Sequence, residues 1–204
     1  MDHPMPIIIL AAGQSARMRG RDKLLEHIDG APLLRLQTIK ALAVATGPVI
    51  VALPPVPHPR HAALSGLDVE ICEVRDAVEG MNASLRTAMK SLPEDAQSAM
   101  VLLGDLPDLT VDDLRQVANA VDLDSATWVW RGATDAGAPG HPIVFRSNLF
   151  AAFATLKGDS GGREVVAQAK GHIKLIPLPG TRARLDLDTP QAWADWRRSR
   201  RRSE

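Results

Sequence analysis

The feature that most constrains the fold is an apolar run, residues 7–10, together with the loop that follows it. The run is short and rich in β-branched residues, which is typical of a strand buried on both faces. Small residues follow it directly, Ala11, Ala12 and Gly13. Such a turn at the carboxyl end of a buried strand lets backbone N–H groups approach an anion. Four cations then occur within seven positions, at Arg17, Arg19, Arg21 and Lys23.

This stretch predicts a polyphosphate site. Backbone N–H groups would bind the phosphate oxygens, and the arginine and lysine side chains would neutralise their negative charge. It is neither the G-x-x-x-x-G-K-[ST] phosphate loop nor the G-x-G-x-x-G dinucleotide loop, since neither spacing is present. A surface turn carrying scattered solvated charges is the alternative interpretation.

Strands and helices alternate along the rest of the chain. Short apolar runs predict strands at 49–53, 69–74, 100–103, 127–131, 140–145, 174–178 and 184–188. Helices are expected at 33–45, 82–92, 111–121, 163–169 and from 190 onward, with Asn82 as one N-cap and Thr110 opening a capping box. A strand, a helix and a second strand in this order imply a right-handed parallel unit. The pattern therefore predicts an α/β fold.

Acidic residues lie near the ends of two predicted strands. Asp105 follows the strand 100–103, at the edge where open α/β sheets bind ligands. Asp186 and Asp188 are two residues apart, so on a strand they would point to one face and converge on one cation. Carboxylates suit Mg²⁺, which prefers hard oxygen ligands. The alternatives are that Asp105 caps a turn and that Asp188 caps the helix starting at Pro190.

Two glycine-containing turns complete the candidate site. Gly80 and Ser84 lie around the start of a predicted helix that faces the same edge as the first loop, although Gly80 could serve the turn alone. Residues 158–162 read GDSGG, a serine-protease signature. Protease folds of that type are all-β with several disulfides, whereas this chain alternates strands and helices and has one cysteine. The motif is better interpreted as a glycine turn.

The loop closely resembles the LA(A/G)GxSxRMGxxK signature of nucleotidyltransferases that attach a nucleotide to molybdopterin. The matching residues are Leu10, Ala11, Ala12, Gly13, Ser15, Arg17, Met18 and Lys23. Arg19-Gly20 replaces the single glycine after Met18, so the loop is one residue longer. Further family stretches resemble residues 80–85, 104–107, 140–145, 158–163 and 186–190. With alanine at position 12, the loop resembles the cytidine-using branch, the molybdenum cofactor cytidylyltransferases (MocA-like, MobA-like NTP transferases). Glycine at this position is similar to the guanosine-using branch.

The resemblance implies a single three-layer α/β/α domain of the Rossmann-like nucleotide-diphospho-sugar transferase type, with a mainly parallel sheet. It implies catalytic roles for Lys23, Arg17 and Asp105. Nucleotide-binding residues would be Leu10, Ala11, Ala12, Gly13, Ser15, Arg17, Lys23, Gly80, Ser84 and Asp105. Residues binding the acceptor would be Gly140, His141, Asp159, Gly161 and Arg163, although His141 could instead be structural. Mg²⁺ would be held by Asp105 and Asp188, with Asp186 in support.

The implied activity is transfer of CMP from CTP to the terminal phosphate of Mo-molybdopterin, which yields the cytosine dinucleotide and pyrophosphate. An apo-molybdoenzyme would be the recipient of the product. Two alternatives stay open: a related enzyme using GTP or a sugar or alcohol phosphate, and a non-catalytic carrier of the finished cofactor.

Composition excludes little but agrees with this interpretation. The 204 residues carry a formal net charge of zero, which favours neither nucleic acid nor membrane as a partner. A single cysteine and the absence of an export signal predict a cytoplasmic protein. We expect one nucleotidyltransferase domain over residues 1–196. Residues 197–204 are rich in arginine, which is typical of a frayed, solvated basic tail.

Overall fold

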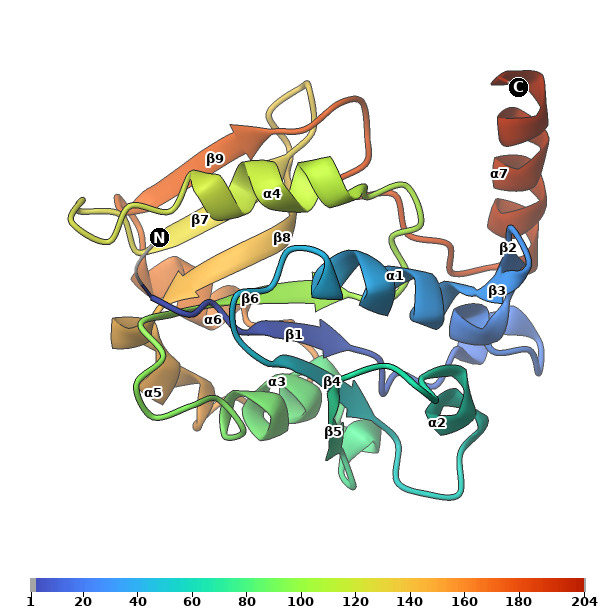
Figure 1. The fold of residues 1–204 in the computed structure, drawn as a ribbon, viewed down its shortest axis with the longest axis horizontal. Coiled ribbons are helices and arrows are strands. Elements are labelled where there is room, and N and C mark those ends of the chain that lie inside the picture. The colour runs from blue at the N-terminus through green and yellow to red at the C-terminus, as the bar shows by residue number, and fades with distance from the viewer. Residues whose placement is uncertain (1–2, 204) are drawn as a thin grey trace.

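The computed structural model describes residues 3–203 and is built on one seven-stranded sheet (Figure 1). The strand order is β5-β4-β1-β6-β8-β7-β9. The strands are β1 (Ile7–Leu10), β4 (Val49–Leu53), β5 (Glu70–Glu73), β6 (Ser98–Leu103), β7 (Val129–Ala133), β8 (Pro139–Arg146) and β9 (Ile173–Pro177). Strand β8 is antiparallel to both neighbours and the other pairings are parallel. The prediction of a mainly parallel sheet is confirmed.

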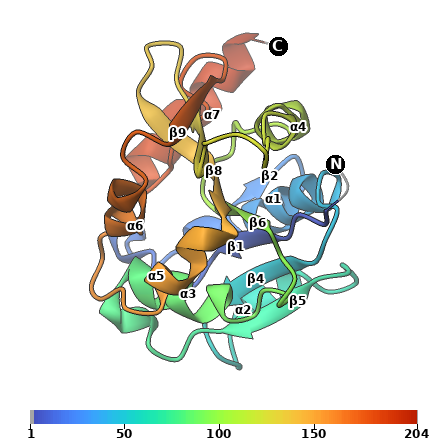
Figure 2. The same ribbon diagram turned by 90° about the vertical axis from the view of Figure 1, so that its left-hand side faces the viewer.

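Helices cover both faces of the sheet and make a three-layer α/β/α domain (Figure 2). Helices α1 (Leu33–Leu42) and α4 (Val111–Asn119) pack on one face. The opposite face carries α3 (Met81–Met89), α5 (Phe150–Phe153) and α6 (Arg163–Gln168). Shorter elements are α2 (Pro59–Ala63), the hairpin β2 (His27–Ile28) and β3 (Ala31–Pro32), and the 3-10 turns η1 (Ala16–Met18), η2 (Lys23–Leu25), η3 (Ala77–Glu79) and η4 (Ser147–Leu149).

Strand β1 shows why the sheet holds together. Ile7 and Ile9 point into the core beneath α1 and α4, and Ile8 and Leu10 point into the core beneath α3. All four side chains are buried, and each such burial stabilises the fold by about 1.5–3 kcal/mol. A strand with two buried faces must be apolar at every position, which is why the sequence shows a continuous run rather than an alternation.

The parallel strands β1, β4 and β6 all end on one side of the sheet, at the right of Figure 1, where β2, β3 and the C-terminal helix α7 (Pro190–Ser203) also lie. The predicted capping box is present at the start of α4, because Thr110 and Asp113 each accept from the other's backbone N–H. None of the helices in the part of the chain that the structure describes combines the length and the apolar character that a membrane crossing requires.

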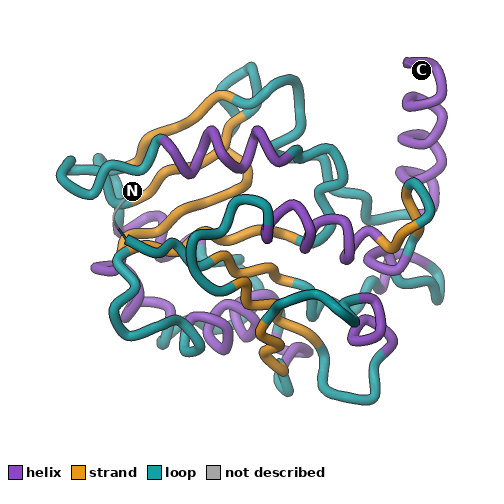
Figure 3. The backbone as a smooth tube through the Cα atoms, in the orientation of Figure 1, coloured by secondary structure: helices purple, strands orange, loops and turns teal. Residues whose placement is uncertain are grey.

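The predicted strand at 184–188 is wrong. The whole segment between β9 and α7 is a loop, drawn in teal in Figure 3. Its backbone bonds to the sheet at isolated points: Leu178 N donates to the carbonyl of Ala133 at 2.8 Å, and the carbonyl of Ala183 accepts from His141 N at 2.7 Å. Leu187 N donates to the carbonyl of Asp105, just after β6, at 3.4 Å. Strands β1 and β8 already lie on either side of β6, so no edge of β6 is free for another strand.

The arginine-rich end is not a frayed tail. Residues 197–203 continue helix α7 (Pro190–Ser203), and residue 204 lies outside the described residues. Arg197 lies 4.9 Å from the centre of the Trp193 ring and bonds to Glu26 at 2.8 Å. Arg200 lies over Trp196 and bonds to Asp29 at 3.0 Å. These cation–π contacts and ion pairs give the like charges partners on the domain.

Candidate active site

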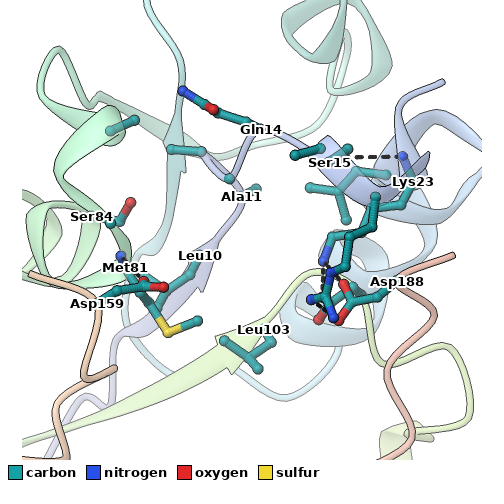
Figure 4. Close-up of a pocket in the computed structure, with 18 of the residues that line it drawn as sticks. Leu10, Ala11, Gln14, Ser15, Lys23, Met81, Ser84, Leu103, Asp159 and Asp188 are labelled. Atoms are coloured by element: carbon teal, nitrogen blue, oxygen red, sulfur yellow. Dashed lines mark hydrogen bonds and ion pairs between the residues drawn. The ribbon is translucent and has the colours of Figure 1, made fainter. Parts of the chain in front are cut away.

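A cavity of about 360 Å³ opens at the carboxyl ends of β1 and β6 (Figure 4). We call it the first cavity. The loop after β1 lines one part of it, the start of α3 another, and Asp105 and Asp188 a third. In Figure 4, Lys23 and Asp188 lie on one side, and Met81, Ser84 and Asp159 lie across from them. It is lined by every residue that the sequence assigns to the nucleotide: Leu10, Ala11, Ala12, Gly13, Ser15, Arg17, Lys23, Gly80, Ser84 and Asp105.

The loop after β1 is held in a specific, compact shape. Ser15 and Arg19 adopt left-handed backbone conformations with φ of 53°, as does Gly20 with φ of 83°. The carboxylate of Asp22 accepts from Leu24 N at 3.0 Å and from the Ser15 hydroxyl at 3.3 Å. The Asp22 side chain therefore caps the start of η2 and also holds Ser15, near the beginning of the loop.

Arg60 fixes this loop from a distant part of the chain, and sequence reasoning missed it. Its guanidinium bonds to both oxygens of Asp22, at 2.7 and 2.8 Å, and to the carbonyl of Ala11 at 2.5 Å. Only 2% of Arg60 is exposed. Burial alone would raise the pKa of Asp22, but the bonds and charge of Arg60 outweigh it and lower that pKa. No sequence signal marks Arg60, which follows a proline-rich stretch at the start of α2.

Lys23 lies between two carboxylates that come from distant segments. Its ammonium donates to Asp105 Oδ2 and, at 2.6 Å, to Asp188 Oδ1. Arg17 donates to the other oxygen of Asp188 at 2.5 Å. The structure thus brings together the cations of the first loop and the acidic residues after β6 and β9, as the sequence predicts. Of the two other loop cations, Arg21 pairs with Glu26 at 3.1 Å.

These contacts change the acid–base behaviour of the cluster. Burial would lower the pKa of Lys23, but the Asp105 and Asp188 carboxylates raise it. Burial likewise would raise the pKa of Asp188, whereas Lys23, Asp186 and Arg17 lower it. The pKa of Asp186 is raised by burial and by the negative charges of Asp188 and Asp105. Lys23 is therefore firmly cationic. The raised pKa of Asp186 means that a further positive charge beside it would favour its ionised form.

The acidic cluster fits a divalent cation. Asp105, Asp186 and Asp188 each offer an oxygen within 4.8 Å of the others. They converge although residues 184–188 form no strand, so the predicted strand alternation is not the cause. The Oδ1 atom of Asp105 is buried and has no hydrogen-bond partner among the residues that the structure describes. A buried carboxylate oxygen without a partner is costly, and a hard cation such as Mg²⁺ satisfies it.

The start of α3 is tied to the GDSGG turn. The Asp159 carboxylate accepts from Met81 N at 2.6 Å, and a Cβ added to Gly80 would lie 2.7 Å from Cβ of Asp159. The prediction of Asn82 as N-cap is wrong, because α3 begins at Met81 with Gly80 before it. Asn82 is instead fully buried and bonds to Lys157 O, Ser160 Oγ and Gly162 N. It thus organises the GDSGG segment, which the sequence analysis interprets as a glycine turn.

A second cavity, of about 310 Å³, adjoins the first and shares Met81, Leu103 and Asp159 with it. It is lined by all five residues that the sequence assigns to the acceptor, Gly140, His141, Asp159, Gly161 and Arg163, and also by Asp186. Two arginines that sequence reasoning missed, Arg131 on β7 and Arg184 in the loop after β9, line it as well.

His141 is an uncharged group in this cavity. Burial, and then the positive charge of Arg131, lower the pKa of His141 to about 3. At neutral pH its imidazole carries one N–H and one acceptor nitrogen and adds no charge. The neighbouring Gly140 is required sterically, because a Cβ there would lie 2.1 Å from the carbonyl of Ala183.

Comparison with known proteins agrees with this geometry. The MobA-like NTP transferase domain matches residues 7–173. The purine catabolism protein PucB of Bacillus subtilis is 27% identical over 94% of this chain and 95% of its own length. The molybdenum cofactor guanylyltransferase of Cupriavidus metallidurans is 27% identical over 84% of this chain and 83% of its own. The bifunctional protein GlmU of Sorangium cellulosum is 31% identical over 58% of this chain, but this match spans only 26% of the GlmU protein.

Solved structures share the fold. Rv0371c from Mycobacterium tuberculosis has a TM-score of 0.81 and 27% identity, covering 97% of both chains. The manganese complex of Rv0371c has a TM-score of 0.76 and 23% identity, over 94% of this chain and 97% of that one. A CMP:2-keto-3-deoxy-manno-octonic acid synthetase complexed with CTP has a TM-score of 0.73 and 17% identity, over 98% and 100%.

The family match and the fold define a nucleotidyltransferase-type domain. The chain belongs to the MobA-like NTP transferase family.

Proposed function

We propose that this chain transfers CMP from CTP to the terminal phosphate of Mo-molybdopterin. The observation that carries the proposal is the placement of Lys23 and Arg17 against Asp105 and Asp188 in the first cavity, which adjoins the second. One cavity is suited to a nucleoside triphosphate and the other to an acceptor. A phosphate oxygen of the acceptor would form a bond to the α-phosphorus, while the bond from that phosphorus to the bridging oxygen breaks and pyrophosphate leaves.

The residues of the chain would act by positioning and charge neutralisation, without a covalent intermediate. Lys23 and Arg17 would bind the triphosphate and stabilise the charge that grows on pyrophosphate. Gly13 leaves open space at the loop, since a Cβ there would meet nothing within 4 Å, so the backbone is accessible to phosphate. Gly80 and Ser84 would shape the nucleotide pocket from the far side. Asp159, between both cavities, would border the two substrates.

Mg²⁺ would be held by Asp105 and Asp188 with Asp186 in support, and when bound it would supply charge neutralisation on the phosphate oxygens. The unpartnered Oδ1 of Asp105 supports this assignment. The manganese complex of Rv0371c supports use of a divalent metal, with Mg²⁺ itself as the proposal.

Cytidine as the base is supported by Ala12, which lines the first cavity and is 3% exposed. One methyl group discriminates by only about 1–3 kcal/mol. The related guanylyltransferase makes GTP the competitor to test first. Delivery of the product to an apo-molybdoenzyme and a cytoplasmic location belong to the same proposal.

Pyrophosphate release, measured with each of the four NTPs and with or without Mo-molybdopterin, tests this function. We expect release that requires CTP, Mg²⁺ and the acceptor together. The variant Ala12→Gly should shift the preference toward GTP, and Lys170→Ala, an exposed lysine, serves as the matched control.

Each alternative gives a different result. Preference of the unmodified protein for GTP would identify a guanylyltransferase. Release only with a sugar or alcohol phosphate would identify another acceptor. Binding of the finished dinucleotide without any pyrophosphate release would identify a carrier and overturn the proposal.

A further inference from the structure

Three arginines from separate segments surround the second cavity. Arg131 lies in the middle of β7, paired in register with Ile143 of β8 and Leu175 of β9. Arg163 is the first residue of α6, and Arg184 lies in the loop between β9 and α7. All three line the same cavity of about 310 Å³. We call them the arginine trio.

The positive charges of the arginine trio have almost no hydrogen-bond or carboxylate partners within the described residues. Arg131 donates from Nε to the carbonyl of Gly140 at 2.8 Å, which leaves its two terminal amino groups without a bond inside the described residues. No carboxylate of the described part of the chain lies within 4 Å of Arg131, Arg163 or Arg184. Other arginines, such as Arg60 and Arg197, do have such partners.

The three charges also act on one another. Burial, and then the charges of Arg184 and Arg163, lower the pKa of Arg131. A partly buried guanidinium that faces two others and has no carboxylate within 4 Å is destabilising in the free protein. The remaining polar groups of the cavity do not remove this excess. His141 is neutral, Asp159 is bonded to Met81 N, and Asp186 faces the Asp105–Asp188 cluster.

We infer that the arginine trio is a binding site for a phosphate-type dianion of the acceptor, in which Arg131 and Arg184 act together with Arg163. Guanidinium groups bind phosphate through paired N–H donors, and three of them match the oxygens of one phosphomonoester. An acceptor without such a group leaves the trio unpaired and is rejected. The inference rests on the proposed function only in treating the second cavity as the acceptor site.

Chemical labelling of arginine tests the site without any turnover. The whole protein is treated with phenylglyoxal, with and without millimolar inorganic phosphate, and the labelled peptides are identified by mass spectrometry. We expect phosphate to slow labelling of Arg131 and Arg184 severalfold. Arg115, an exposed residue paired with Asp112 on α4, is the control whose labelling should not change. Because each arginine is identified separately, protection at Arg17 in the first cavity is read independently.

Kinetics of two variants give the second readout. Arg131→Gln and Arg184→Gln should each raise the acceptor KM about tenfold or more, the effect of losing a charge-assisted bond. The KM for CTP should stay unchanged, as should both constants in Arg115→Gln. Arg184→Lys should restore part of the loss, because it returns the charge but not the paired donors. A thermal unfolding curve close to that of the unmodified protein shows that each variant is folded.

The two proposals fail in different ways. Unchanged labelling of Arg131 and Arg184 in phosphate, in a protein that still releases pyrophosphate from CTP, would overturn the trio and leave the proposed function standing. Protection of both arginines in a protein that releases no pyrophosphate with any NTP would support the anion site and overturn the proposed function. A rise in the KM for CTP equal to that for the acceptor would also refute the assignment of the trio.

Discussion

The two cavities differ in how their positive charges are balanced. In the first, Lys23 and Arg17 are paired with Asp105 and Asp188, so the cations and carboxylates are matched before any ligand arrives. In the second, the arginine trio has no carboxylate within 4 Å among the described residues. A matched cluster suits a ligand that brings both charges, such as a metal with a polyphosphate. An unmatched cluster suits an anion alone.

Removing a cation from the paired charges of the first cavity should have the largest effect on activity. Lys23→Ala removes the ammonium that both carboxylates share, and we expect turnover to fall by a factor of about 10²–10³ with the fold intact. Because Asp105 and Asp188 then face each other without that cation, binding of Mn²⁺ should become tighter. Pyrophosphate release and metal titration measure the two effects. Lys170→Ala is the control, and near wild-type incorporation of labelled CTP by Lys23→Ala would remove Lys23 from the mechanism.

Breaking the support of the first cavity should cost stability as well as activity. Arg60→Met leaves the carboxylate of Asp22 and the carbonyl of Ala11 without their partner, which should lower the free energy of unfolding by about 3 kcal/mol. The KM for CTP should rise because the loop loses its shape. Urea unfolding measures the first effect and steady-state kinetics the second. Arg115→Met, at an exposed pair, should change neither, and an unchanged KM in Arg60→Met would show that the loop holds its shape without Arg60.

The junction of the cavities can be tested at Gly80. Its φ of 109° and ψ of −172° lie in a region reserved for glycine, and an added Cβ would also press on Asp159. We expect Gly80→Ala to lower the free energy of unfolding by about 1–3 kcal/mol and to raise the KM of both substrates. Gly137→Ala separates the causes, since Gly137 has φ of 77° but open space around it. Equal effects in the two variants would mean that only backbone strain matters.

The last test concerns the neutral member of the second cavity, whose effect is absent at neutral pH and grows only as the pH falls. The pKa of His141 is lowered to about 3 from an ordinary value of 6.5, so between these values the unfolded chain binds the extra proton. The free energy of unfolding should therefore fall as the pH drops below 6.5, by up to about 1.4 kcal/mol per pH unit. His141→Gln should make this slope shallower, and the exposed His27→Gln should keep it. Urea unfolding between pH 7 and pH 4.5 measures the slope, and an identical slope in His141→Gln would refute the assignment.

Local pattern was a good guide to the elements of this protein. The apolar runs that become β1 and β4 were identified within their observed bounds, because a doubly buried strand leaves a continuous signature. Pattern failed at 184–188, where alternating apolar and acidic residues imitate a strand in a segment that only crosses the sheet end. It failed at Asn82 for a similar reason, since an amide suits both a cap and a buried hydrogen-bonding centre.

The sequence by itself determined which residue types could do chemistry here: a small-residue loop with cations, and carboxylates after a buried strand. Only the tertiary structure decided how the Lys23 ammonium is shared between Asp105 and Asp188, which lie 82 and 165 positions away in the chain. It alone decided that Arg60 supports the loop and that Arg131 and Arg184 face one cavity. The physical reason is that strand and helix periodicity records whether a side chain is buried. It does not record which residues from distant parts of the chain that side chain contacts in the folded protein.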